Sequence, residues 1–307
     1  MSDHEITTDT LPPPEVLNMD ELSGTIWSKL DALGCSTALP ERFPRFMACF
    51  ESLYAAIKQT FACGIDVVVA SKADIAVYGL GRLCLEDFTE IVFLVEHDYG
   101  YAAVKLLRGL YERAVVNQVI VENPGEEGTR FYDYYTVEER KFNRRAGSIY
   151  EGWDDDPSGI KKFYDQNKDA YKYEPCEECH QTPQQSWSKY SLVDLAGNLG
   201  KATNDLALQG LGKELRDLYL TCALVPNKYI HASISSILQR ITERPDGFVF
   251  DPASYALTYA HLLILLALDT QNQYFKLKME QVLEPLYRDR DKAWSVTPTM
   301  AETPTVG

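Results

Sequence analysis

Apolar residues recur at intervals of three and four along most of the chain. This spacing places them on one face of an α-helix, because the helix has about 3.6 residues per turn. It predicts helices over residues 21–33, 43–64, 74–97, 99–125, 126–150, 159–173, 191–200, 207–225, 226–241 and 252–287. The one strand-like stretch is IDVVVAS (65–71), and it is short. We therefore expect an all-α fold, a helical bundle of long antiparallel helices.

The two ends of the chain lack this pattern. Residues 1–20 are acidic and proline-rich, and residues 293–307 are mostly small and polar. Such compositions predict a disordered leader and a disordered tail. EGWDDDPSG (151–159) is a candidate boundary between domains, but the links between the helices are short. We expect residues 21–292 to form a single helical domain.

The chain carries no predicted export or membrane signal. Its start has no apolar segment of the kind found in signal peptides, and the apolar run 255–270 is shorter than the roughly 20 residues that a membrane span needs. The sequence therefore favours a cytoplasmic protein with no membrane partner. Seven cysteines, mostly single within helical patterns, are expected to be reduced thiols.

The charge of the protein bears on its partners. The formal net charge is −15, and such a field repels polyanions, so binding to RNA would need a local basic patch. One candidate is ERKFNRR (139–145), which follows the aromatic stretch RFYDYY (130–135). This segment could grip phosphates and stack bases. It could equally be a solvated helix face.

The predicted helix 99–125 is apolar on most of its circumference, yet LLRGLYERAV (106–115) carries Arg108 and Glu112 four residues apart. At about 100° per residue these two side chains share one flank. One interpretation is an ordinary surface ion pair. The other is that the pair faces an internal cleft, where each charge must be paired or hydrogen-bonded.

The segment PNKYIHASISS (226–236) holds a second polar group. Asn227, His231 and Ser235 would lie on one flank of a helix, beside an apolar stripe that starts at Ile230. Histidine titrates near neutral pH, so His231 is a candidate general acid or base. The alternative is a core histidine that bonds to a carbonyl group.

CEECH (176–180) has the spacing of a c-type haem attachment motif, but haem attachment requires export. A zinc site with Cys176, Cys179 and His180 as ligands is the better functional interpretation. Zinc sites usually have four ligands, and the chain has no second Cys-x-x-Cys. The alternative interpretation is therefore a solvated loop with two free thiols. No other cofactor is indicated, because the phosphate-loop, GxSxG and helical Glu-x-x-His motifs are all missing from the sequence.

Four segments resemble a bacterial family of uncharacterised helical proteins, domain-of-unknown-function family 5677, in their order and spacing. They are LLRGLYERAV (106–115), FYDYYTVEERK (131–141), SWSKYSLVDLAGNLG (186–200) and YIHASI (229–234). The resemblance spans residues 75–240. It implies that Arg108, Glu112 and His231 are characteristic polar positions of the family, and it implies no established reaction.

The chain is also loosely similar to the HEPN class of helical-bundle ribonucleases. Their signature is an arginine, a polar residue, three further residues and a histidine. PNKYIH keeps Asn227 and His231, but Pro226 stands at the arginine position. Arg108 would then have to supply the guanidinium from another helix. In such a metal-independent mechanism His231 would move a proton at the ribose 2′-OH, Arg108 would stabilise the phosphorane, and Glu112 would orient Arg108.

The sequence thus leaves two hypotheses for the function. The first is a HEPN-like ribonuclease of a toxin or phage-defence type, with RNA as its partner. The second is a non-catalytic helical protein that binds a protein partner or a small ligand, in which Arg108, Glu112 and His231 form a buried structural network. The net charge favours the second, and the joint presence of the three polar residues favours the first. Both hypotheses allow the protein to form a homodimer.

Overall fold

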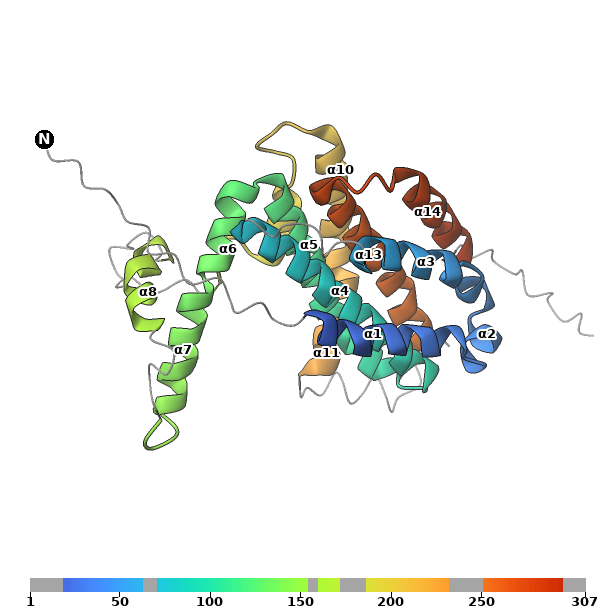
Figure 1. The fold of residues 1–307 in the computed structure, drawn as a ribbon, viewed down its shortest axis with the longest axis horizontal. Helices are drawn as coiled ribbons and strands as arrows, with labels where there is room; N and C mark the ends of the chain where they lie inside the picture. Colours follow the sequence, from blue (N-terminus) through green and yellow to red (C-terminus); the bar gives the residue numbers. More distant parts are fainter. Residues whose placement is uncertain (1–18, 63–70, 154–159, 172–185, 232–250, 295–307) are drawn as a thin grey trace, which may run out of the picture.

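The helices of this computed structural model cover nearly all of the residues it describes, which are 19–62, 71–153, 160–171, 186–231 and 251–294 (Figure 1). Within these ranges no strand is present, so the predicted all-α bundle is confirmed. Residues 65–70 of the strand-like segment 65–71 lie outside the described residues, as do residues 1–18 of the predicted leader 1–20 and residues 295–307 of the predicted tail 293–307. Residues 19–20 and 293–294 were expected to be disordered but belong to helices.

Three long helices form the centre of the bundle: α4 (Lys72–Glu96), α5 (Gly100–Glu122) and α13 (Pro252–Phe275). A capping box starts α4, in which the Ser71 side chain accepts from the backbone N–H of Asp74 and the Asp74 side chain accepts from that of Ser71. A three-residue link, 97–99, turns the chain back, so α5 packs antiparallel to α4. Gly100 lets α5 begin against α13, because a Cβ there would lie 2.8 Å from the backbone nitrogen of Ala253.

Helix α13 is longer than its apolar run 255–270 suggests. Its length and composition would allow it to cross a membrane, yet 67% of its most apolar window is buried inside the protein. Buried leucines and alanines run along it, and it packs on both α4 and α5. Its apolar character is explained by its place as a core helix.

Shorter helices cover the centre on two sides (Figure 1). On one side, α1 (Met19–Gly34) packs on α4, and α3 (Pro44–Ala62) packs on α13 and α14. On the other side, α9 (Leu192–Asn198) and α11 (Val225–Ile230) pack on α5, and α10 (Leu206–Tyr219) packs on α9. The short α2 (Ala38–Arg42) leads into α3.

The predicted helix 252–287 is wrong as a single element. It forms α13 and α14 (Glu280–Trp294), which are joined by a turn in which Lys276 and Lys278 have positive φ. Asn272 holds this turn, since its side chain accepts from the backbone N–H of Met279 and donates to Glu280. The second helix runs to Trp294, two residues past the predicted end of the domain at 292.

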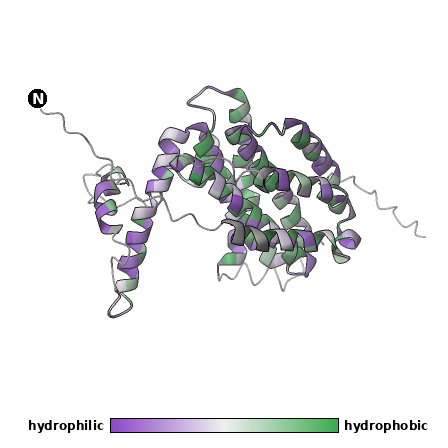
Figure 2. Ribbon diagram, viewed as in Figure 1, coloured by the Kyte–Doolittle hydropathy of each residue, from purple (hydrophilic) through white to green (hydrophobic). Residues whose placement is uncertain are grey.

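The predicted helix 126–150 is also divided. It consists of a π-helical turn η2 (Pro124–Gly128), α6 (Thr129–Asp133) and α7 (Tyr135–Gly147). Helix α7 pairs with α8 (Ile160–Asn167) and its 3-10 extension η3 (Lys168–Tyr171). Together they form an arm that stands away from the bundle and is more hydrophilic than it (Figures 1 and 2).

Candidate functional site

Arg108 and Asn227 are brought together by the fold. Arg108 lies on α5 and donates from Nη1 to the side-chain oxygen of Asn227 on α11. Both residues are half-buried. Two segments that sequence analysis singled out, 119 residues apart, therefore meet in one side-chain contact.

The approach to Asn227 is irregular because of Pro226. The chain before it forms a π-helical turn, η4 (Leu220–Leu224). In π-helical bonding the partner of the Thr221 carbonyl would be the N–H five residues later, at Pro226, and proline has none. The hydroxyl of Tyr255 on α13 donates to that carbonyl instead, at 2.7 Å. The hydroxyl of Tyr111 on α5 donates to the Leu215 carbonyl of α10 at 2.7 Å, so one tyrosine fixes the turn η4 to the core and the other fixes the helix before it.

The other predicted site residues do not join this contact. Glu112 is exposed, and in the described part of the chain it makes no ion pair with Arg108. His231 follows Asn227 by one helical turn, since its backbone N–H donates to the Asn227 carbonyl at 3.2 Å. The predicted helix 226–241 does not run through His231, however, because α11 ends at Ile230 and His231 is extended, with φ −89° and ψ 143°. His231 and Ile230 are exposed, and Ser235 lies outside the described residues. A buried Arg108–Glu112–His231 network is therefore not formed.

The buried charge pair of LLRGLYERAV is a different one. Arg113 donates from Nη1 to Oδ2 of Asp87 on α4, and the Asp87 side chain is only 12% exposed. Gly109 leaves room for the Arg113 guanidinium, because a Cβ at Gly109 would lie 2.5 Å from Nη1. Burial raises the pKa of Asp87 to about 6, even though Arg113 opposes the shift. This pair holds α4 to α5.

The proposed zinc ligands Cys176, Cys179 and His180 lie outside the described residues. Within the residues that are described, no cluster of three or more histidine, cysteine, aspartate or glutamate side chains could hold a metal ion. The basic segment 139–145 lies on α7, where Arg144 and Arg145 are exposed on the hydrophilic arm.

A groove with aromatic walls opens where the α7–α8 arm leaves the bundle. Its volume is about 570 Å³. One wall comes from the first half of α4, and the other comes from α6, the start of α7 and Trp187. We call it the aromatic groove, and its lining residues are Ile75, Ala76, Gly79, Leu80, Leu83, Phe131, Tyr132, Tyr134, Tyr135, Glu138 and Trp187.

The walls of the aromatic groove are held by contacts behind them. Trp187 is buried, lies edge-on to Phe131 at 5.5 Å between ring centroids, and accepts at its carbonyl from Arg130 at 2.7 Å. Tyr134 is buried edge-on to Tyr171 of η3 at 5.2 Å. The groove is therefore a feature of the packed structure and does not depend on exposed side chains alone.

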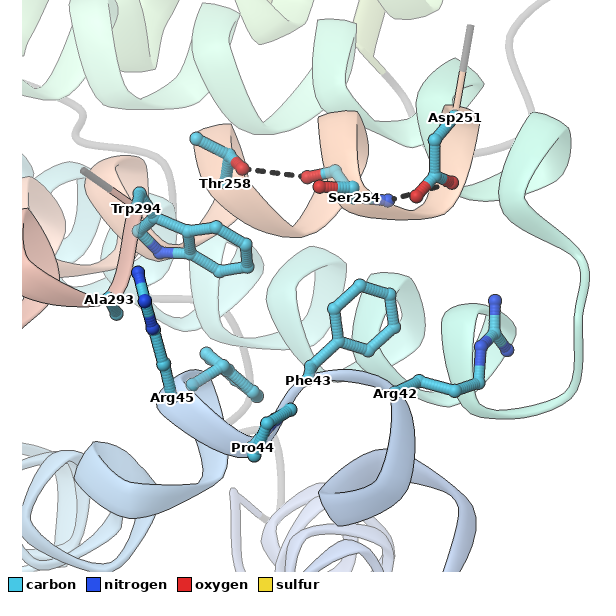
Figure 3. A pocket seen from close by; sticks show the side chains of 10 residues that line it. Arg42, Phe43, Pro44, Arg45, Asp251, Ser254, Thr258, Ala293 and Trp294 are labelled. Atoms are coloured by element: carbon cyan, nitrogen blue, oxygen red, sulfur yellow. Dashed lines mark hydrogen bonds between the residues drawn. The ribbon is translucent and has the colours of Figure 1, made fainter. Parts of the chain in front are cut away.

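A second pocket, of about 490 Å³, lies between α2, α3, α13 and α14. Figure 3 shows Phe43 and Trp294 projecting into it, with Ser254 and Thr258 of α13 on the far wall. Trp294 is held by its indole N–H, which donates to Nδ1 of the fully buried His261 at 3.1 Å. Arg42 on its rim is already engaged, since it donates to the Val95 carbonyl and the Asp98 carboxylate.

Part of the aromatic groove is visible in the sequence. Phe131, Tyr134 and Tyr135 belong to the aromatic stretch RFYDYY (130–135), which was expected to stack bases or to lie on a solvated helix face. Trp187 stands about 50 residues away along the chain, and Gly79 reads only as a residue that weakens a helix. No feature of the second pocket is visible in the sequence pattern.

Comparison with known proteins places the chain in a family. No curated protein and no solved structure matches it. Residues 74–248, more than half of the chain, match a family of unknown function (DUF5677). The match covers α4 to α11 and contains Arg108, Asn227 and the whole lining of the aromatic groove. The protein therefore belongs to the DUF5677 family, as the four resembling segments indicated.

Proposed function

We propose that this protein is a non-catalytic helical binding protein that takes a small ligand into the aromatic groove. The observation that carries this proposal is the groove itself. Its volume of about 570 Å³ falls within the roughly 300–1,000 Å³ typical of small-molecule sites, and apolar and aromatic side chains with few polar groups are the usual lining of such sites. Arg108 and Asn227 are then a structural link between α5 and α11.

Gly79 allows a test that separates binding from folding. A Cβ at Gly79 meets no atom within 4 Å, because the residue faces the open groove. In Gly79→Leu the new side chain fills part of the groove. The same change removes a glycine from the interior of α4, which favours the helix by about 1 kcal/mol. The variant should fold at least as well as the wild type and bind less.

Gly210 supplies the matched control. It lies inside α10, is exposed, and also has open space at its Cβ position, but it does not line the aromatic groove. The probe is N-phenyl-1-naphthylamine, a neutral dye whose fluorescence rises in apolar sites. We expect saturable binding by the wild type and by Gly210→Leu, and at least a tenfold weaker affinity for Gly79→Leu. Equal binding by all three proteins would contradict the proposal.

A HEPN-like metal-independent ribonuclease of a toxin or phage-defence type is the second candidate. The observation in its favour is the contact between Arg108 and Asn227, with the exposed His231 four residues further along. Asn227, and not Glu112, would then orient Arg108 toward a phosphate. The net charge of −15 weighs against it, because an RNA would approach against the field of the protein.

Cleavage of labelled total RNA in the presence of a chelator tests this candidate. Wild type, His231→Ala and Arg108→Ala are compared, with Arg144→Ala as a control for loss of one exposed positive charge. Cleavage that is lost in the first two variants and kept in the third would establish the ribonuclease. Under the binding proposal none of the four proteins cleaves the RNA.

A further inference from the structure

We infer that the ligand of the aromatic groove is an organic cation, an ammonium group that carries apolar substituents. This inference rests on the proposed function, because it names the class of ligand for the same groove. It follows from three properties: the faces of the aromatic rings, one carboxylate at the rim, and the charge of the whole protein.

The aromatic rings supply the first property. The face of an aromatic ring carries negative electrostatic potential and attracts a cation within about 6 Å of the centroid. Two ammonium groups of the protein lie near rings of this groove, but each is bound by an oxygen atom. Lys141 Nζ lies 5.0 Å from the centroid of Tyr134 and donates to its hydroxyl at 2.7 Å, and Lys72 Nζ lies 5.8 Å from the centroid of Tyr132 and pairs with Asp133 at 2.6 Å.

Tyr135 and Trp187 remain for a ligand. Tyr135 is 49% exposed, and among the described residues it has no aromatic, cation or hydrogen-bonding partner. Trp187 forms a buried wall, and indole is the ring that binds cations best. Several aromatic rings that line one groove match the way proteins bind quaternary ammonium groups.

Glu138 supplies the second property. Among the described residues that line the groove it alone is charged. It follows Tyr134 and Tyr135 by four and three positions in α7, so it lies on the same side of the helix as those rings. Its side chain is exposed at the rim, yet the surrounding walls remove enough water to raise its pKa, and this effect outweighs the opposing effect of Lys141. A cation would replace the lost hydration, whereas an anion would be repelled.

The net charge of −15 supplies the third property. A negative field raises the local concentration of cations and their association rate, and it opposes anions in the same groove. An apolar neutral ligand would gain nothing from Glu138 or from the field. The three properties together therefore favour a cation over ligands of the same shape without charge.

The test compares two ligands of one shape. Choline and 3,3-dimethylbutan-1-ol differ in the replacement of a positive nitrogen by carbon, and both dissolve well enough for competition against N-phenyl-1-naphthylamine at low ionic strength. We expect choline to displace the dye from the wild type at a concentration at least fivefold below that of the alcohol. We expect Glu138→Gln to abolish most of this preference.

Glu139→Gln is the matched control. It changes the net charge by the same amount, but Glu139 does not line the groove. The preference for choline should survive in this variant. If the dye binds and the two competitors are equal, the groove is a binding site for neutral ligands and the inference is wrong while the proposed function stands. If the dye does not bind the wild type in a saturable way, the proposed function itself fails.

Discussion

Acidification should destabilise the protein through His261. This side chain is fully buried in α13 and packs edge-on against Phe46 at 5.3 Å between ring centroids. Burial, assisted by the positive charge of Arg290, lowers the pKa of His261 to about 3. The geometry agrees, because Nδ1 accepts from the indole N–H of Trp294 at 3.1 Å, and a protonated ring would have no lone pair there.

The size of the effect follows from linkage. The pKa of a histidine in the unfolded chain is about 6.5, so between about pH 6.5 and pH 3 only the unfolded state binds this proton. Stability is therefore full above the unfolded pKa and is lost as the pH falls toward the folded one. Between pH 8 and pH 5 the loss from this one group is about 2 kcal/mol.

Urea unfolding at pH 8 and pH 5 measures this loss when wild type is compared with His261→Asn. Asparagine keeps an acceptor for Trp294 and cannot become charged, so its packing cost is the same at both pH values. The wild type should lose about 2 kcal/mol more than the variant on acidification. His97→Asn, at an exposed histidine, controls for the loss of a histidine as such. If wild type and His261→Asn lose equal stability, His261 is not held neutral by burial and the reasoning is wrong.

Three further predictions concern the core. The pKa of Asp87 is raised to about 6, so its folded state binds a proton more readily than the unfolded chain does. Acidification from pH 8 to pH 5 therefore stabilises the fold through Asp87 by about 1 kcal/mol, opposite in sign to the effect of His261. Urea unfolding of Asp87→Asn at the two pH values should show that this gain is lost. Gly212→Ala should lower the free energy of unfolding by about 1–3 kcal/mol in a thermal unfolding experiment, because the new Cβ would lie 2.6 Å from the Ala196 carbonyl oxygen. Gly210→Ala in the same helix places its Cβ in open space and should instead raise the melting temperature. Tyr255→Phe leaves the Thr221 carbonyl without its donor, and should cost about 1–3 kcal/mol in urea unfolding; no change in stability would mean that this hydroxyl does not hold the π-helical turn.

The helices of the bundle could be predicted because their cause is local. The spacing of apolar residues places α1, α3, α4 and α5 to within about three residues of their observed ends, and this spacing is a property of the helix itself. The division between α13 and α14 has a different cause. It depends on the side chain of Asn272 reaching Met279 and Glu280 across a turn, and the apolar pattern on both sides conceals it.

Two glycines show why the site was harder to predict than the fold. Gly79 and Gly81 both weaken α4 when they are judged by helix propensity. In the structure Gly81 makes room for Gln271, since a Cβ would lie 2.4 Å from its amide nitrogen, and Gly79 opens onto the aromatic groove. The structural role of each glycine depends on residues that are distant in sequence. The spacing of residues within one helix carries no information about those neighbours.

The same limit applies to the polar residues. Arg108 stood out correctly as a polar residue of an apolar helix that meets another segment, and its contact with Asn227 joins two of the chosen motifs. Its i+4 neighbour Glu112 lies where no helix of the described structure covers α5, so it is exposed. The buried pair is Arg113 with Asp87, and its one signal in the sequence is Gly109 four residues earlier.

The most direct test of the aromatic groove as a binding site is a crystal structure of the protein with N-phenyl-1-naphthylamine bound. We expect the dye between Gly79 on α4 and the rings of Phe131 and Trp187, and an empty pocket beside Trp294. Dye bound beside Trp294, or found only at contacts between molecules in the crystal, would contradict the claim that the aromatic groove is the binding site of this protein.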